Sequence, residues 1–519
     1  MAKKVNENRE YDFIYSDEDK LTADGTKRHS PFFKPDWSPD SFMSLMYTCH
    51  FAMYKRSIVN ELGGLRVGFE GAQDYDFTLR FVEKAGAIGH IPKILYHWRE
   101  REESIASNPE SKPYALKAVK RCKEEALKRR GLEGEVVYVP DMFQYRVNYI
   151  SKNCPKVSII IVTNGNNNNL TQCVESIIGK TTYKNFEIII IDNCNKGEDT
   201  NYNKELCQKY KCSYYSVEKL YNISELYNIG TSYATGDFFL FLNEDILIGS
   251  PEWLDLLVGQ CELRHIGAVG TKILYNNTNR IEHCGMINLE SGPCFSFYGF
   301  DDQYCYYYGR NRMDYNCFAV SGGCLIIQRI KFEEVGGFNK DCNNNILCDV
   351  DLCSKLIHKG YYNFVKNNSI MYINKSYEDI PAINLATDEI DPFYSKNLTK
   401  RKTNFEINTN LLEKMNSVSN ISKLDIDKRI NQSVVGVIDS VENGQVIKIE
   451  GWGFMKSTLF KNMNKIQLLL INNEGYGYKV KTNTIYRPDV TAAFDNESNL
   501  NLTGFQCYID RNLIIKNNY

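Results

Sequence analysis

The stretch Val157-Ser-Ile-Ile-Ile-Val162 decides the fold class, because a short continuous run of β-branched residues is typical of a strand buried on both faces. The polar cluster Asn164 to Asn169 follows it, then a helix-like stretch Leu170 to Ile178, and then a second apolar run, Ile188-Ile-Ile-Ile191, which ends at Asp192. This order of strand, loop, helix and strand indicates a βαβ unit. We therefore expect an α/β domain with a parallel sheet covered by helices.

Acidic residues follow the ends of these predicted strands. Asp192 ends the second run, and a further run, Asp237-Phe-Phe-Leu-Phe-Leu242, leads directly into Asn243-Glu244-Asp245. The carboxyl ends of parallel strands form the crevice in which open α/β folds bind ligands. Asp245 can supply an oxygen ligand for Mg²⁺ or Mn²⁺ when substrate phosphates complete the shell. An acidic turn or helix N-cap is the alternative that spacing alone leaves open.

Composition excludes several classes of protein. At about 150 residues per domain, a chain of 519 residues predicts three to four domains. A hydrophobic content of 43% and a net charge of -2 fit a globular protein and leave no basic excess for binding nucleic acid. The 17 cysteines form no zinc-site spacing, and no secretory signal or run of about 18 apolar residues occurs. We expect a cytoplasmic protein whose membrane association, if any, is peripheral at the inner face.

The chain changes character along its length. We expect one domain at 1–150, with a helix from Tyr114 to Arg130, a second at 151–400, a polar linker at 401–432 with a helix near Asn404 to Met415, and a small all-β module at 433–519. The apolar runs of that module, separated by Asn and Gly turns, are Val434 to Val437, Gln445 to Ile449, Lys465 to Leu470 and Gly504 to Ile509.

An internal repeat links the first two domains. An arginine before a Gly-Gly pair, an Asp-x-Asp triplet and an Ile-x-Tyr sequence occur twice in the same order. The first set is Arg56, Gly63-Gly64, Asp74-Tyr-Asp76 and Ile94-Leu-Tyr96-His97, and the second set is Arg329, Gly336-Gly337, Asp349-Val-Asp351 and Ile370-Met-Tyr372-Ile373. We call residues 1–150 the first copy and residues 151–400 the second copy.

The first copy has only Met1 to Asn8 before Tyr11, too few residues for a βαβ start, so we expect it to be a half-domain. A half-domain exposes a sheet edge and an apolar face. We expect the first copy either to pack against the second copy or to pair with a separately encoded first half. Alone, it should aggregate or remain partly unfolded, and it should bind no nucleotide sugar.

Other candidate residues have two interpretations each. Asp349 and Asp351 precede Leu352 and Leu356 at helical spacing, so they open an amphipathic helix either as functional carboxylates or as capping residues. His283 fits a satisfied turn histidine better than a metal ligand. The Asn164 to Asn169 run has no GxGxxG or P-loop signature and no Lys or Arg, which disfavours dinucleotide binding and nucleotidyl transfer.

Together these residues resemble the family 2 glycosyltransferases of GT-A fold, particularly bacterial, rhamnosyltransferase-like enzymes that build cell-surface polysaccharide. The resemblance covers roughly residues 155–400, through Val157 to Thr163, Ile188 to Asp192, Asn222 to Ser224, Asn228 to Gly230, Ala234 to Asp237, Phe241 to Asp245, Ala319 to Leu325, Gly336 to Phe338 and Asp349 to Cys353. The first copy resembles the acceptor half of such an enzyme, through Tyr15 to Asp19, Gln73 to Asp76 and Tyr96 to Trp98. Residues 433–519 resemble a β-sandwich module found beside such enzymes, through Gly451 to Phe454, Arg487 to Val490 and Thr503 to Phe505.

The resemblance implies a Rossmann-like, mostly parallel sheet with helices on both faces, and it implies roles for single residues. Thr163 and Asp192 would hold the nucleotide base and ribose, Asn228 and Asn243 would also bind the donor, Asp245 would bind Mn²⁺ or Mg²⁺ on the diphosphate, and Asp349 would be the catalytic base.

The implied reaction moves a sugar from a nucleotide-sugar donor to a hydroxyl of a cell-surface glycan or of its lipid-linked precursor, with inversion. Such enzymes usually place a histidine where this sequence has Ile373 and Asn374, whereas the first copy keeps His97. The alternative is therefore a non-catalytic glycan-binding or scaffold protein derived from a glycosyltransferase.

Overall fold

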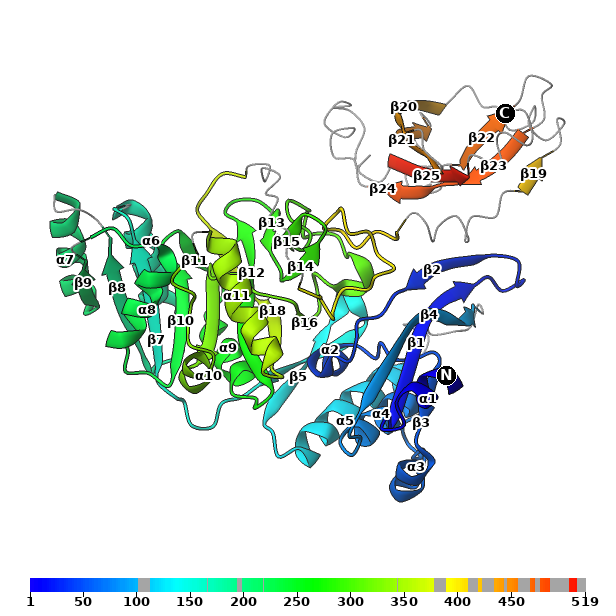
Figure 1. The fold of residues 1–519 in the computed structure, drawn as a ribbon, viewed down its shortest axis with the longest axis horizontal. Coiled ribbons are helices and arrows are strands. Elements are labelled where there is room, and N and C mark those ends of the chain that lie inside the picture. Colours follow the sequence, from blue (N-terminus) through cyan, green and yellow to red (C-terminus); the bar gives the residue numbers. More distant parts are fainter. Residues whose placement is uncertain are drawn as a thin grey trace. The chain divides into compact units, whose positions relative to one another are not determined.

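The structure is a computed structural model. It describes residues 1–100, 113–165, 167–193, 198–217, 219–342, 344–377 and 389–408, and further on residues 419–421, 434–442, 446–455, 467–471, 477–485 and 504–510 (Figure 1). The chain divides into two compact units, one of Met1–Ala23 and Ser30–Glu406 and one of Asp24–His29 and Ile407–Tyr519. Both copies of the repeat lie in the first unit, apart from Asp24–His29 of the first copy.

The second copy is built on a ten-stranded sheet in the order β11-β18-β12-β17-β10-β7-β8-β9, with β13 beside β12 and β16 beside β18. The strands β7, β8, β9 and β10 pair in parallel. Strand β17 is antiparallel to both β10 and β12, so β12 and its parallel neighbour β18 run in the same direction as β10. The sheet is therefore mostly parallel, as predicted. The strands are β7 (Val157–Thr163), β8 (Phe186–Asp192), β9 (Ser213–Ser216), β10 (Phe238–Asn243), β11 (Ile246–Ile248), β12 (Ile266–Tyr275), β13 (Ile281–His283), β16 (Tyr315–Cys317), β17 (Cys324–Gln328) and β18 (Tyr362–Ile373); a separate hairpin pairs β14 (Met286–Leu289) with β15 (Gly292–Phe295).

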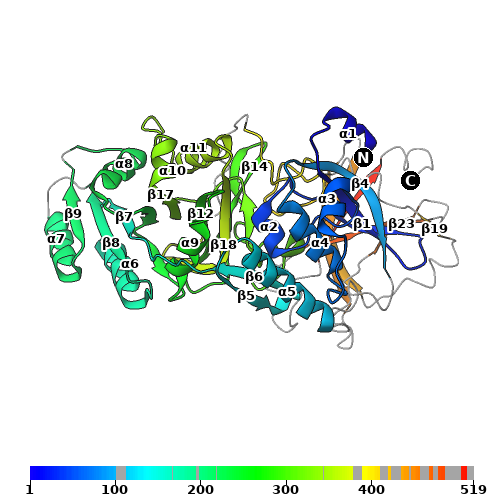
Figure 2. The same cartoon turned by 90° about the horizontal axis from the view of Figure 1, so that it is seen from below.

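Helices cover both faces of this sheet, as Figure 2 shows. One face carries α6 (Asn167–Lys180), α7 (Glu198–Tyr210) and α9 (Trp253–Cys261), and the other carries α8 (Ile223–Tyr233), α10 (Arg329–Glu334) and α11 (Asn345–His358). Ile159 and Ile161 of β7 pack into the first core, whereas Ile160 and Val162 pack into the second. A strand buried on both faces needs apolar residues at every position, which explains the continuous β-branched run.

The first copy repeats part of the second copy in its structure as well. Its strand β1 (Phe13–Leu21) pairs antiparallel with β3 (Ala52–Tyr54) and parallel with β4 (Ile88–Arg99), as β12 pairs with β17 and β18. Helices α3 (Arg56–Leu62) and α4 (Gln73–Val82) correspond to α10 and α11. In the described part of residues 1–150, no strand corresponds to β7, β8, β9 or β10. The remaining elements are α1 (Ala2–Glu7), β2 (Arg28–Phe32), α2 (Pro39–Ser44), α5 (Pro113–Arg129), β5 (Gly134–Val139) and β6 (Gln144–Tyr149).

A buried carboxylate joins the two copies. Asp40 of the first copy is only 3% exposed, and it accepts hydrogen bonds from Gln260 Nε2 at 3.1 Å and Asn316 Nδ2 at 2.9 Å of the second copy. His265 Nε2 also lies 3.1 Å from each carboxylate oxygen of Asp40. The packing of the first copy against the second copy is thus confirmed.

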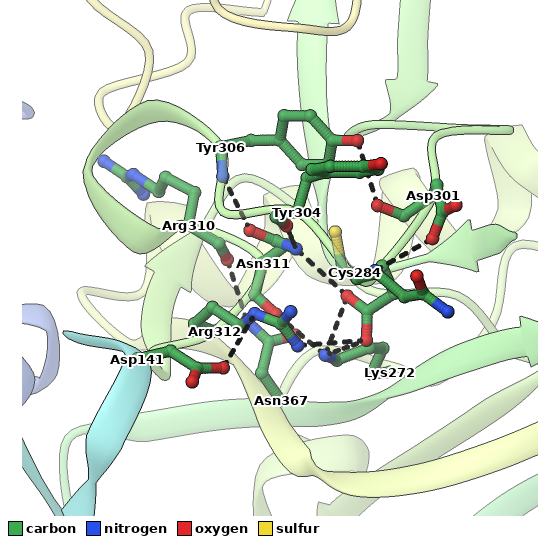
Figure 3. Close-up of polar contacts among 12 residues, drawn as sticks. Asp141, Lys272, Cys284, Asp301, Tyr304, Tyr306, Arg310, Asn311, Arg312 and Asn367 are labelled. Carbon is green, nitrogen blue, oxygen red and sulfur yellow. Dashed lines mark hydrogen bonds and ion pairs between the residues drawn. The ribbon is translucent and has the colours of Figure 1, made fainter. Parts of the chain in front are cut away.

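A buried lysine organises the loop of residues 301–313 in the second copy (Figure 3). The Lys272 ammonium lies 3.1 and 2.8 Å from the two carboxylate oxygens of Asp302 and donates to the carbonyl oxygen of Asn311 at 2.8 Å. The loop also carries Tyr307, whose hydroxyl donates to the carbonyl oxygen of Phe33 in the first copy at 2.8 Å. The lysine therefore holds in place a loop that touches both copies.

The C-terminal unit contains two small antiparallel sheets. One is β19 (Ser419–Ile421), β23 (Gly477–Lys481) and β22 (Gln467–Ile471), and the other is β20 (Val434–Glu442), β21 (Val446–Met455), β25 (Gly504–Asp510) and β24 (Asn483–Ile485). Val480 of the first sheet shares a core with Ile449 and Phe505 of the second, which is the arrangement of a β-sandwich.

Two details of the predicted linker are corrected. Strand β19 lies within residues 401–432, so the β-rich part begins before residue 433. Residues 404–408 form a turn and a single bridge instead of a helix, and the rest of the helix predicted near Asn404 to Met415 lies outside the described residues. In the described residues, no helix is both long and apolar enough to cross a membrane.

Candidate active site

Two predicted residues lie at the carboxyl edge of the sheet. Thr163 and Asp192 end β7 and β8 and are paired in register. The Thr163 hydroxyl donates to Glu244 Oε2 at 2.6 Å, and the Asp192 carboxylate accepts from Asn203 Nδ2 at 2.9 Å and from the Tyr214 hydroxyl at 2.6 Å. Burial raises the pKa of Glu244. The strand ends thus bring polar side chains together at the carboxyl edge of the sheet, where the topology predicts a binding site.

Asp245 lies in the turn between β10 and β11 and is only 5% exposed. Its Oδ2 lies 2.5 Å from the ammonium of Lys375. Lys375 directly follows Ile373 and Asn374, which stand where such enzymes usually have a histidine. Its Oδ1 is buried and accepts no hydrogen bond from the described residues. The carboxylate therefore has one paired and one unpaired oxygen.

Asp349 lies in the second turn of α11, not at its start. Asn344 caps the helix by accepting from the backbone N–H of Leu347 at 3.2 Å, so capping does not explain Asp349. The Asp349 carboxylate is 7% exposed and accepts from the backbone N–H of Gly322 at 2.7 Å. Burial raises its pKa to about 7, although the Gly322 N–H lowers it. A carboxylate with this pKa can exchange a proton near neutral pH.

The glycine at position 322 makes this contact possible. A Cβ atom there would lie 2.5 Å from Asp349 Oδ1, closer than any side chain tolerates. Asp351 by contrast forms an ion pair with Lys355 at 2.6 Å, with about a third of each side chain exposed. Of the two predicted carboxylates, only Asp349 is buried.

The sequence reasoning missed Glu282 on β13. Burial raises its pKa to about 8, with Lys375 lowering the pKa and Asp245 and Asp349 raising it. Its Oε2 is buried without a hydrogen bond to the described residues. The signal available in the sequence was its neighbour, His283. The His283 side chain is fully buried and both ring nitrogens have partners: Nδ1 lies 2.9 Å from the carbonyl oxygen of Thr271, and Nε2 accepts from the N–H of Ser321. His283 is thus hydrogen-bonded at both ring nitrogens, as predicted, but it ends strand β13 and does not lie in a turn.

Two further predicted residues are bonded to the protein itself. Both polar atoms of the Asn228 amide bond the backbone of Phe338, at 2.9 and 3.1 Å, which favours a structural role in positioning that turn. Asn243 ends β10, and its Oδ1 accepts from the Tyr227 hydroxyl at 3.2 Å. Asn243 lies directly beside the Glu244 and Asp245 pair.

The unpaired Oδ1 of Asp245 bears on whether a divalent ion fits. Mg²⁺ and Mn²⁺ take oxygen ligands and are commonly held by one or two carboxylates together with substrate phosphates. A buried carboxylate oxygen without a hydrogen bond provides such a ligand. The residues therefore fit an ion on Oδ1, while the ammonium of Lys375 opposes it from Oδ2.

The fold and this edge of the sheet define an α/β domain with polar and acidic side chains gathered at the carboxyl ends of its strands. Residues 158–336 match the family model described as glycosyl transferase family 2. The second copy is therefore similar to this family over residues 158–336, and the resemblance inferred from the sequence is confirmed.

Two curated proteins are similar to the chain over a longer stretch. The uncharacterized protein y4gI of Sinorhizobium fredii is 33% identical over 423 residues, which cover 76% of this chain and 46% of that protein. The O-antigen biosynthesis protein RfbC of Myxococcus xanthus is 35% identical over 331 residues, which cover 63% of this chain and 26% of that protein. The chain thus spans less than half the length of either relative.

Two solved structures resemble part of the fold at low sequence identity. The mannosyltransferase PcManGT of Pyrobaculum calidifontis, solved with GDP-Man and Mn²⁺, is 15% identical with a TM-score of 0.33, over 51% of this chain and 66% of that chain. GalNAc-T7, solved with UDP, GalNAc and Mn²⁺, is 14% identical with a TM-score of 0.39, over 67% of this chain and 74% of that chain.

Proposed function

We propose that the second copy transfers a hexose from a nucleotide-sugar donor to a hydroxyl of a cell-surface glycan or of its lipid-linked precursor, with inversion at the anomeric carbon. The observation that carries the proposal is the buried Asp349, whose pKa of about 7 suits a general base. The similarity to the family and to an O-antigen biosynthesis protein supports the choice of a glycan acceptor.

The proposed chemistry assigns each side chain one task. Asp349 accepts the proton of the attacking hydroxyl, and the Gly322 N–H fixes its carboxylate. Attack on the face opposite the leaving group inverts the anomeric centre when no enzyme nucleophile intervenes. Thr163, Asp192 and Asn243 line the side of the donor, where the strand ends offer polar groups for the nucleoside.

Departure of the nucleoside diphosphate leaves negative charge that has to be stabilised. Asp245 would hold Mn²⁺ or Mg²⁺ through Oδ1, and the ion would supply positive charge next to the diphosphate. The exposed Lys375 is a second source of positive charge at the same carboxylate.

A panel of nucleotide sugars tests this proposal. Each is titrated into the full chain with and without Mn²⁺ by calorimetry, and hydrolysis of the bound donor is then followed. We expect one class of nucleotide sugar to bind and to be hydrolysed slowly without acceptor. Absence of binding across the panel would contradict the proposal.

A second candidate function is a glycan-binding or scaffold protein without turnover. The ion pair between Lys375 and Asp245 favours it, because the ammonium occupies one oxygen of the carboxylate that would hold the ion. Binding of a glycan without hydrolysis of any nucleotide sugar would support this candidate.

The lysine gives a direct prediction about metal affinity. We expect Lys375→Ala to bind Mn²⁺ about 10- to 100-fold more tightly in the presence of the nucleoside diphosphate, because the change removes a like charge close to the ion. The control is Lys355→Ala, which removes another paired lysine, that of Asp351. Unchanged or weaker Mn²⁺ binding by Lys375→Ala would contradict the assignment.

The C-terminal unit is expected to contribute to acceptor recognition or assembly and not to the chemistry. A chain ending at Glu406, where the first compact unit ends, should therefore bind and hydrolyse the donor as the full chain does, within about twofold. The comparison is made by calorimetry and hydrolysis on both chains. A folded shortened chain that no longer binds donor would show that the unit belongs to the catalytic core.

A further inference from the structure

The loop that precedes β3 in the first copy differs in its chemistry from its counterpart in the second copy. Tyr54 of β3 pairs with β1 as Ile327 of β17 pairs with β12, so the two loops can be matched residue by residue. Cys49 and His50 then stand where the second copy has Gly322 and Gly323. The glycines leave room for Asp349, whereas the first copy places a thiol and an imidazole beside the corresponding Asp74.

These three side chains form a compact cluster. A sulfur of Cys49, a ring nitrogen of His50 and a carboxylate oxygen of Asp74 all lie within 4.8 Å of one another, and each residue is partly exposed. Among the residues that the structure describes, it is the one cluster of at least three Cys, His, Asp or Glu residues whose ligand atoms lie this close together. Ligands around one tetrahedral ion have to approach one another to a similar extent, because metal to ligand distances are about 2.0–2.3 Å.

Neighbouring groups hold the loop that carries the cluster. The buried ammonium of Lys34 donates to the carbonyl oxygens of Cys49 at 2.9 Å and His50 at 3.2 Å. The backbone N–H of His50 donates to the Glu18 carboxylate, whose Oε2 also lies 3.4 Å from His50 Nδ1. The His50 ring stacks on Tyr96 with centroids 4.9 Å apart. The thiol and imidazole are therefore positioned by the protein before any ligand arrives.

We propose that the first copy binds a Zn²⁺ ion through Cys49 Sγ, the His50 imidazole and the Asp74 carboxylate. Thiolate and imidazole ligands select zinc over Mg²⁺ and Ca²⁺, which take oxygen. Three protein ligands leave a fourth position for water or for Glu18. This site is separate from Asp245, and the proposal does not depend on the activity of the second copy.

Binding requires the thiol to lose its proton, which passes to solvent as the sulfur to zinc bond forms. Burial raises the pKa of the Cys49 thiol, so it is protonated in the absence of an ion. Its sulfur contacts the carbonyl oxygen of Met46 at 3.5 Å, a weak hydrogen bond that zinc binding would replace.

Cobalt is the probe for this site, because Co²⁺ takes zinc sites and a cobalt to thiolate bond gives a charge-transfer absorption. The full chain is titrated with Co²⁺ and then with Zn²⁺. We expect the band to saturate at one equivalent, to disappear when Zn²⁺ displaces the cobalt, and to be absent in Cys49→Ser. Asp74→Asn should weaken binding at least 10-fold.

Two exposed cysteines, Cys154 and Cys305, provide matched controls, since Cys154→Ser and Cys305→Ser should keep the band. No band in the wild type, or a band that persists in folded Cys49→Ser, would overturn the proposal. Should Cys49→Ser not fold, X-ray absorption on the zinc-loaded wild type decides: one sulfur in the coordination shell supports the site, and a shell of oxygen and nitrogen alone overturns it.

Discussion

Replacing Asp349 with asparagine is expected to lower the rate of sugar transfer by about 10²–10⁴, the range typical for loss of a general base. Asparagine keeps the shape of the side chain and an oxygen that can accept from the Gly322 N–H, but it cannot take up a proton. Donor affinity should therefore stay within about threefold. Single-turnover transfer and calorimetric titration of the donor separate the two effects, and wild-type transfer rates in the variant would refute the assignment of the base.

The pH dependence gives a second measurement on the same residue. Since burial raises the pKa of Asp349 to about 7, transfer by the wild type should rise with pH through about 7. The raised pKa also means that the unfolded chain, with a pKa of about 3.9, loses its proton first, so stability falls as the pH rises from about 4 to 7. Asp349→Asn removes this penalty, and urea unfolding at pH 8 should show a more stable variant. The free energy of unfolding of the variant minus that of the wild type should be larger at pH 8 than at pH 5. A smaller difference at pH 8 would contradict a buried carboxylate with a raised pKa.

The largest effect on stability is expected from Lys272→Met. Lys272 is 3% exposed and Asp302 is 8% exposed, so the change removes the nearer cation of a buried carboxylate and leaves only Arg312, whose Nη1 lies 3.6 Å from Asp302 Oδ2. Removal of one partner from a buried ion pair typically costs about 3–5 kcal/mol. Urea unfolding followed by tryptophan fluorescence measures the loss.

The double variant Lys272→Met with Asp302→Leu is the control, because it removes both charges and should recover most of the stability. Lys355→Met removes the lysine of the partly exposed pair with Asp351 and should cost below about 1 kcal/mol. A loss below 1 kcal/mol in Lys272→Met itself would show that the network in Figure 3 does not hold the loop.

Local patterns predicted the strands and the edge of the sheet well. The run from Val157 fixed β7, because a strand with cores on both faces has to be apolar throughout. Asp192 was placed correctly for the same reason: a polar residue that ends such a run has to leave the core at the end of the strand. The repeat predicted that two segments would share one arrangement, and the matching registers of β1 and β12 bear this out.

Contacts between residues far apart in sequence could not be predicted in this way. Glu282 and Lys375 meet Asp245 only because β13 and the end of β18 are folded to the same edge, and neither has a local pattern that marks it. The contact of Asn228 is another example, since its amide bonds the backbone of Phe338, 110 residues away, and no local pattern marks this partner. The predicted start of α11, at Asp349, lies about one turn after the observed start at Asn345. The cap, Asn344, lies outside the amphipathic pattern on which the prediction was based.

The two copies share one continuous apolar core, which runs from Phe13 and Phe81 of the first copy to Val157, Trp253 and Phe364 of the second. Folding of one copy is therefore thermodynamically linked to folding of the other, and the pair should melt in a single transition. In evolutionary terms, a destabilising substitution in the first copy also lowers the amount of folded second copy, because the two copies unfold together. Selection on the second copy alone is then enough to preserve the fold of the first, whatever its own side chains bind.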